Sequence, residues 1–151
     1  MVNLTEIKEC PYYLITRASL VITAHLKREL ASAGVGMARP AYLGVLMSLW
    51  HEDGLKTVDL GRRAGLEPSS MTGLLDRMER DCLVTRQADP DDRRAHLIYL
   101  TQQGQQVKEP SLAVVDRTLN FIFEGVSDED QERIKKILRH MLANTHRQDK
   151  P

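Results

Sequence analysis

The chain has 151 residues, of which 42% are hydrophobic and 5% are aromatic, and its length predicts a single helix-rich domain spanning 1–151. Basic and acidic residues number 21 each, so the overall charge excludes a strongly basic nucleic-acid-binding chain, and any binding to DNA must depend on where individual arginines lie. No apolar run is long enough to span a membrane and the first residues lack a signal region, so we expect a cytoplasmic protein that does not bind membranes.

The first third of the sequence predicts two helices. Pro11 begins a long one that runs to about Ala33, with apolar residues at helical spacing over a band too wide for one neighbour. We expect this helix to pack on the core and also on a second subunit. Pro40 begins another helix, almost wholly apolar, which should be buried and should end at His51.

The next residues have the pattern of a helix-turn-helix. Thr57 is expected to cap a short helix, which Gly65 ends in a left-handed conformation. Pro68 suits the first turn of a second helix that runs to about Asp81. Apolar residues at helical spacing give this second helix its inner face: Met71, Leu74, Leu75 and Met78. The second helix of such a motif fits the major groove of DNA.

Two β-prone runs follow, at 83–88 and 96–100, and the residues between them form a polar loop. This pattern predicts a hairpin with a charged tip, known as a wing. Arg93 and Arg94 lie in that tip, where guanidinium groups can reach the minor groove or the phosphates beside the second helix. Residues 55–101 are therefore the expected DNA-binding core.

The last third predicts two further helices. Thr101 should cap the first, and Pro110 should kink or break it within the preceding turn because proline removes a helical hydrogen bond. Ser127 should cap the last helix, which carries a single apolar stripe that needs a covering surface. Since the small winged core cannot cover both chain ends, we expect 11–33 and 101–145 to form an α-helical dimer interface.

In two stretches, SSMTGLLDRMERDCLVTR and DPDDRRAHLIYLTQQG, the sequence resembles the MarR family of winged helix-turn-helix regulators. The resemblance extends over nearly the whole chain, because the family has helices before and after this core in the same order. It implies a homodimeric transcriptional regulator that binds double-stranded DNA, a repressor relieved by a small-molecule effector. The two recognition helices would enter successive major grooves of a pseudo-palindromic operator, about 34 Å apart.

The resemblance also assigns roles to single residues. It implies that Arg94 enters the minor groove and that Asp92 orients it, with Arg93 beside them in the wing. The residues that it implies face the major groove are Ser69, Ser70, Thr72 and Gly73. Two positions depart from the family. Gly73 replaces a residue that is often long and polar, which shifts base reading toward DNA shape, and Cys82 replaces the glycine that ends the recognition helix, at a strain of about 1 kcal/mol.

Four further arginines are candidates for contacts with phosphates or for orienting roles. They are Arg62, Arg63, Arg77 and Arg86. The alternative for each is an exposed charge or an intramolecular pair with Asp59, Asp76 or Asp81. For Arg77 we favour the structural role.

An effector pocket is expected between the dimer helices and the winged core. The candidates to line it are Tyr13, Arg17, His25, Tyr42, Met47, Trp50 and His51. This mixture of apolar, aromatic and a few polar groups suits a small aromatic acid. The alternative is that all seven are core and surface residues without a pocket.

Cys10 raises the alternative of a thiol-based peroxide sensor. One branch of the MarR family senses organic hydroperoxides through a cysteine at the start of its first helix, which two tyrosines hold. Aligned through Pro40 without gaps, those three positions fall on Leu14, Arg28 and Arg39, so the triad is absent. Cys10 lies about one helical turn away from the family position, and the competing interpretation is an ordinary exposed thiol.

Residue types that carry catalysis form no recognisable arrangement. The five histidines and two cysteines lie in no metal-binding or CxxC spacing, so we expect neither enzyme activity nor a metal or other cofactor. A rival function of another class is a winged helix that docks on proteins and binds no DNA, which the neutral overall charge supports.

Overall fold

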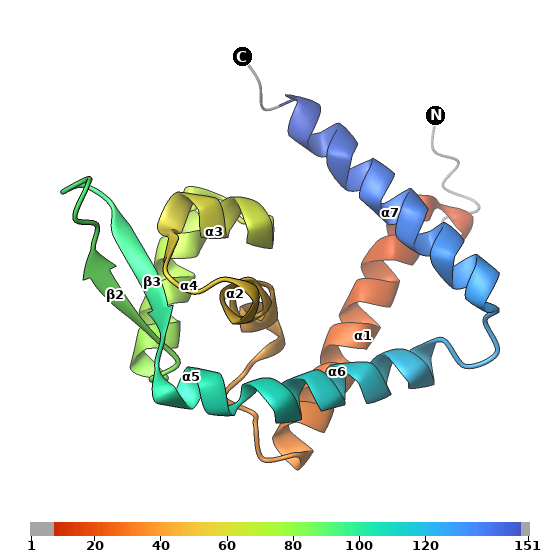
Figure 1. The fold of residues 1–151 in the computed structure, drawn as a ribbon. Helices are drawn as coiled ribbons and strands as arrows, with labels where there is room; N and C mark the ends of the chain where they lie inside the picture. The colour runs from red at the N-terminus through yellow and green to blue at the C-terminus, as the bar shows by residue number, and fades with distance from the viewer. Residues whose placement is uncertain (1–7, 149–151) are drawn as a thin grey trace. The chain divides into compact units, whose positions relative to one another are not determined.

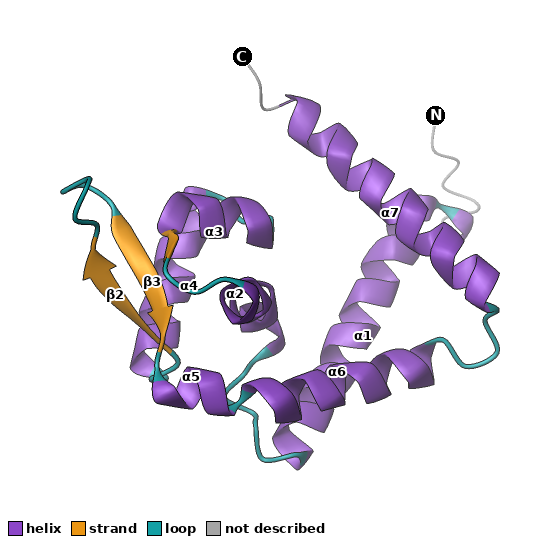
Figure 2. Ribbon diagram, in the orientation of Figure 1, coloured by secondary structure: helices purple, strands orange, loops and turns teal. Residues whose placement is uncertain are grey.

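The structure is a computed structural model that describes residues 8–148, with side chains described up to Asn144. It is mainly helical with a small antiparallel sheet, as the sequence predicted (Figure 2). In chain order the elements are α1 (Pro11–Ser32), α2 (Pro40–His51), β1 (Leu55–Lys56), α3 (Thr57–Ala64), α4 (Pro68–Arg80), β2 (Val84–Ala88), β3 (His96–Leu100), α5 (Gln102–Gln106), α6 (Lys108–Ile122) and α7 (Asp128–Gln148).

The chain divides into two compact units. The first ends at Thr118 and the second begins at Leu119. In the first unit, α2 lies nearly end-on in Figure 1, with α3, α4 and the sheet around it. The prediction that α2 is buried is confirmed, since Val45, Leu46 and Leu49 are at most 1% exposed. Side chains of the surrounding elements complete this core: Leu60, Met71, Leu75, Met78, Leu83 and Ile98.

The helix-turn-helix forms where the sequence predicted it. α3 ends at Gly65, which has a left-handed conformation with φ 68° and ψ 33°. Pro68 occupies the first position of α4, and the four predicted inner residues of this helix are buried. The expected cap at Thr57 is wrong. Lys56 holds the cap position of α3, and the Thr57 hydroxyl instead donates a 3.4 Å hydrogen bond to the carbonyl of His96.

The sheet contains one strand that the sequence did not predict. β1 has only two residues, too few to display the alternation that identifies a strand. The strand order is β1-β3-β2, and both pairings are antiparallel. Leu55 pairs with Ile98, so β1 ties the start of α3 to the middle of the wing.

Close packing at the base of the wing requires one glycine and strains one cysteine. Cys82 follows α4 with φ 56°, the left-handed value expected there. The Thr101 hydroxyl donates to the Cys82 carbonyl at 2.5 Å and accepts from the Gly104 amide at 3.0 Å, which confirms Thr101 as the cap of α5. A Cβ on Gly104 would lie 2.1 Å from the Leu83 carbonyl oxygen, so only glycine fits there.

The C-terminal helices begin and end near the predicted residues. Val107 separates α5 from α6, one turn before Pro110, as the proline predicted. In the second unit, the Ser127 hydroxyl accepts a 3.2 Å hydrogen bond from the Asp130 amide at the start of α7.

Two helices, one in each unit, have apolar side chains that the chain itself leaves exposed. On α1 these are Tyr12, Leu14, Ile15, Leu20 and Val21. On α7 they are Ile134, Ile137, Leu138, Met141 and Leu142. Several large apolar side chains exposed on one helix are typical of interaction sites in proteins. Across the described part of the chain, no helix combines the length and apolar character needed to cross a membrane.

Candidate nucleic-acid interface

The outer face of α4 is polar and accessible. Ser69, Ser70 and Thr72 are exposed, and the Thr72 hydroxyl donates a 3.3 Å hydrogen bond back to the Pro68 carbonyl. Gly73 lies between these residues on the same side of the helix, so the backbone is accessible there. The four residues predicted to face the major groove thus share one surface, and their contacts to bases stay a prediction.

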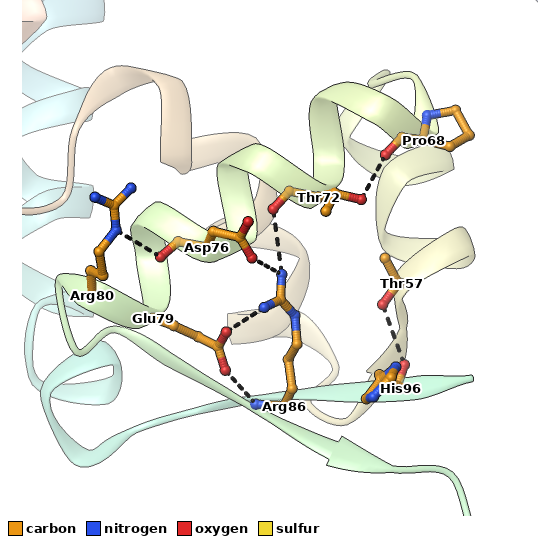
Figure 3. A network of polar contacts seen from close by, with 8 residues as sticks. All are labelled: Thr57, Pro68, Thr72, Asp76, Glu79, Arg80, Arg86 and His96. Carbon is orange, nitrogen blue, oxygen red and sulfur yellow. Dashed lines mark hydrogen bonds and ion pairs between the residues drawn. The ribbon is translucent and has the colours of Figure 1, made fainter. Parts of the chain in front are cut away.

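Arg86 on β2 links the wing to this helix (Figure 3). Its guanidinium lies 2.8 Å from Asp76 and 2.5 Å from Glu79, and it donates a 3.4 Å hydrogen bond to the Thr72 carbonyl. The backbone N–H of Arg86 also donates to Glu79, at 3.1 Å. Arg86 therefore has the intramolecular role that was its alternative in the sequence, and it neutralises two carboxylates on the recognition helix.

The wing carries its arginines at an exposed tip. Arg93 and Arg94 are both exposed, and within residues 8–148 neither side chain forms an ion pair. The Asp92 carboxylate accepts a 3.0 Å hydrogen bond from the backbone N–H of Arg94, and the Asp92 carbonyl accepts another from the Ala95 amide at 2.9 Å. Asp92 thus fixes the turn of the backbone that presents Arg94, and the guanidinium itself is left available.

An ion pair anchors the other end of the wing loop. The Lys56 ammonium lies 2.8 Å from the carboxylate of Asp89, which is only 5% exposed. The hydrogen bond from Lys56, and then the one from the Asp91 amide, lower the pKa of Asp89. No local pattern predicts this contact, because β1, which positions Lys56, is too short to be recognised from the sequence.

The two arginines of α3 have partners of their own. Arg62 lies 3.2 Å from Asp59, one of the partners proposed in the sequence, and Arg63 lies 2.6 Å from Glu52. Both guanidinium groups remain exposed. Exposed pairs of this kind are weak, about 0 to 1 kcal/mol, so they can be exchanged for phosphate contacts.

Comparison with known proteins identifies this arrangement of helix, turn, helix and wing. The profile of the MarR family matches residues 40–96. The organic hydroperoxide resistance transcriptional regulator of Bacillus subtilis (strain 168) is 31% identical over 110 residues, which cover 73% of each chain. The chain belongs to the MarR family of transcriptional regulators.

Solved structures of MarR-like regulators have the same fold. The transcriptional repressor CouR, of Rhodococcus jostii RHA1, bound to a 23-mer DNA duplex matches with a TM-score of 0.79 and 22% identity, over 93% of this chain and 98% of that one. The PcaV transcriptional regulator from Streptomyces coelicolor, in complex with its natural ligand, matches with a TM-score of 0.80 and 21% identity, over 93% and 96% of the two chains. At these identities the similarity concerns the fold.

In this MarR-family chain, two of the expected effector-binding residues are engaged in the fold. Tyr42 is 1% exposed and donates a 2.8 Å hydrogen bond to Asp81, and its burial and then Asp81 raise the pKa of its hydroxyl. Tyr42 is thus a core residue in this structure, which corrects its assignment to a pocket surface. The half-buried Trp50 donates its indole N–H to the Gly104 carbonyl at 2.9 Å.

The other five expected effector-binding residues lie at or near the surface, and their role stays a prediction. Tyr13 and His25 are half-buried, whereas Arg17, Met47 and His51 are exposed.

The two thiols of this MarR-family chain lie in different surroundings. Cys10 is half-buried at the cap position of α1, where its carbonyl accepts the Leu14 amide at 3.0 Å. Cys82 is exposed, and both cysteines are free. Redox activity of Cys10 stays a prediction.

Sequence reasoning missed one polar cluster beside the recognition helix. Asp81 accepts from the Tyr42 hydroxyl and also lies 3.2 Å from the Arg39 guanidinium, which in turn sits 5.5 Å from the centre of the Tyr42 ring. Asp81 follows α4, whereas the other two residues lie at the start of α2. The residues are about 40 positions apart in the sequence, so no local pattern could have brought them together.

Proposed function

We propose that the chain is a sequence-specific DNA-binding transcriptional regulator that acts as a homodimer and has no enzymatic activity. The observation that carries this proposal is the accessible guanidinium of Arg94 at the wing tip, which forms no ion pair among the described residues. It lies beside a recognition helix whose outward carboxylates are bound to Arg86. Arginines of this kind suit the minor groove, while the polar face of α4 suits the major groove. The DNA-bound state of the CouR repressor supports the same use of the fold.

A second copy of the chain is the proposed partner of the exposed apolar faces. The proposed organisation is one MarR-like domain, 1–151, in which 11–33 and 101–145 supply the dimer interface around the DNA-binding core, 55–101. Acidic residues occupy the first turn of α7, and basic residues follow further along it: Lys135, Lys136 and Arg139. Antiparallel pairing of this helix with its copy would oppose the two charges, which favours association.

An effector is the third part of the proposal. The ligand-bound state of PcaV supports a small molecule as the inducer, and we propose an aromatic acid that binds among Tyr13, Arg17, His25, Met47, Trp50 and His51. In such a dimer the two recognition helices would adopt one spacing that fits DNA and another that does not. A ligand that stabilises the second spacing by about 1 to 3 kcal/mol relative to the first would act as an inducer. Calorimetric titration with a panel of aromatic carboxylates tests this part, and the absence of heat from every compound would contradict it.

The test of DNA binding is a fluorescence-anisotropy titration. A labelled duplex from upstream of the chain's own gene is titrated with the protein and then competed with unlabelled copies of the same duplex and of a shuffled one. We expect saturation at two protomers per site and competition at least 1,000-fold weaker by the shuffled duplex, within the usual specificity range of about 10³ to 10⁷. Equal competition by both duplexes, or no binding at all, would support the protein-docking alternative instead.

A peroxide-responsive thiol is the second candidate. The name of the Bacillus subtilis relative and the half-buried thiol of Cys10 at the start of α1 favour it. Mild peroxide should then produce a sulfenic acid or a disulfide at Cys10, detected by mass spectrometry, together with weaker DNA binding. An unmodified Cys10 with unchanged DNA binding would remove this candidate.

A further inference from the structure

Three arginines surround a small hollow at the C-terminal end of the recognition helix. Arg77 and Arg80 reach it from α4, and Arg39 reaches it from the start of α2. The hollow has a volume of about 120 Å³ and its remaining lining residue is Asp81. All three arginines are exposed, so solvent and ligands have access to them.

The single carboxylate in the hollow does not balance these charges. Asp81 already accepts the Tyr42 hydroxyl at 2.8 Å and the Arg39 guanidinium at 3.2 Å. Arg80 donates only its Nε–H, to the Asp76 carbonyl at 3.4 Å, and within residues 8–148 neither Arg77 nor Arg80 forms an ion pair. Three guanidinium groups and one carboxylate leave a net charge of about two positive units, which repel each other unless an anion binds between them.

One arginine of the hollow also reaches the outer face of the recognition helix. A Cβ on Gly73 would lie 3.5 Å from a terminal nitrogen of Arg77, so this guanidinium extends back along α4 over the glycine. The absence of a side chain at Gly73 therefore leaves Arg77 accessible from the face that is proposed to meet DNA. In homeodomains too, the end of the recognition helix contacts the DNA backbone.

We propose that Arg39, Arg77 and Arg80 together bind a phosphate group. Guanidinium forks match the tetrahedral oxygens of phosphate in paired hydrogen bonds, and three of them can share one group. The phosphate comes either from the DNA backbone, in which case the inference rests on the proposed function, or from a free oxyanion. This assignment gives Arg77 a binding role in place of the structural one that the sequence favoured.

The test compares Arg80→Ala, which leaves both contacts to Asp81 intact, and the double variant Arg39→Ala/Arg80→Ala with the wild type. Lys8→Ala is the matched control, because it removes one exposed positive charge outside every element assigned to DNA. Circular dichroism first establishes that each variant is folded. DNA affinity is then measured from 50 to 200 mM salt, and Tm is measured with and without 10 mM inorganic phosphate at constant ionic strength.

Binding of a DNA phosphate predicts that the slope of log K against log salt falls by about 0.9 for each contact removed, whereas Lys8→Ala keeps the wild-type slope. Binding of a free oxyanion predicts that phosphate raises the Tm of the wild type and of Lys8→Ala but not that of the double variant. Unchanged slopes together with no phosphate response, or with one shared by all four proteins, overturn the inference. If the wild type does not bind DNA, the proposed function is refuted. The Tm measurement then still decides whether the anion site exists.

Discussion

Arg86 of β2 lies 2.5 Å from Glu79 of α4, seven positions earlier in the chain. The Arg86 side chain is only 25% exposed, and its guanidinium also contacts Asp76 and the Thr72 carbonyl. One arginine therefore links the wing to the recognition helix through three residues of α4. It also removes the repulsion that two carboxylates would exert on DNA.

Replacing Arg86 by methionine should destabilise the fold by about 1 to 2 kcal/mol, because the half-buried Glu79 carboxylate and the exposed Asp76 carboxylate lose their partner. DNA affinity should fall at low salt, since both carboxylates become unpaired beside the helix. Urea denaturation and anisotropy titration measure the two effects. In the double variant Arg86→Met/Glu79→Gln, part of the stability should return. A loss of DNA affinity without any loss of stability would instead make Arg86 a direct phosphate contact.

The ion pair between Lys56 and Asp89 should give the fold a dependence on acid pH. The pKa of Asp89 is lowered in the folded state, so its stabilising contribution is present above the unfolded pKa, about 3.9, and is lost as the pH falls through the lower folded pKa. Asp89→Asn should therefore show a smaller loss of stability between pH 7 and pH 2 than the wild type. Urea denaturation across this range measures the difference.

Lys56→Gln is the matching variant, because Lys56 is the main cause of the lowered pKa of Asp89. It should reduce the pH dependence in the same sense. If both variants lose stability with acid as steeply as the wild type, the ion pair does not anchor the wing.

The strained conformation of Cys82 should make glycine the better residue at that position. With φ 56°, Cys82→Gly should raise the free energy of unfolding by about 1 kcal/mol, because glycine adopts the left-handed region without strain. Cys82→Ala is the control, since it removes the thiol but keeps the Cβ, and it should give no such gain. Equal stability of the two variants would mean that the backbone is not strained there.

Replacing Gly73 of α4 and Gly104 of α5 by alanine should change the stability of the fold in opposite directions. Gly104→Ala should destabilise the fold by about 3 kcal/mol, because its Cβ would lie 2.1 Å from the Leu83 carbonyl oxygen. Gly73→Ala should stabilise it by about 0.5 to 1 kcal/mol, because alanine favours helix and its Cβ meets only the Arg77 guanidinium, at 3.5 Å. Thermal denaturation of the pair measures both, and a tolerated Gly104→Ala would contradict the close approach of α5 to Leu83.

Local signals in the sequence predicted most of the fold. Gly65 and Pro68 defined the turn between α3 and α4, and Pro110 predicted the break before α6, because these residues restrict the backbone wherever they occur. The missed features depend on contacts between distant residues. β1 forms through pairing with β3. The same pairing places the Thr57 hydroxyl near the His96 carbonyl, to which it donates a hydrogen bond instead of capping its own helix.

The candidate site was predictable in its residue types but not in its pairings. The polar face of α4 and the exposed arginines of the wing tip follow from helical periodicity and from the composition of the loop. Which carboxylate each arginine contacts depends on the packing of α2 and β2 against α4. For this reason the sequence left Arg86 open between DNA, solvent and a pair with an aspartate such as Asp76. Its contact with Asp76 is found, whereas its contact with Glu79 and the link from Asp81 to Arg39 and Tyr42 were not expected.

The most direct test of the central claim is the salt dependence of DNA binding by Arg94→Ala. If the exposed guanidinium at the wing tip enters the minor groove, the variant should bind the specific duplex about 1 to 3 kcal/mol more weakly, and its salt slope should fall by about one. Lys8→Ala should match the wild type in both respects. A variant Arg94→Ala that binds as tightly as the wild type at every salt concentration would contradict the role of the wing in recognising DNA.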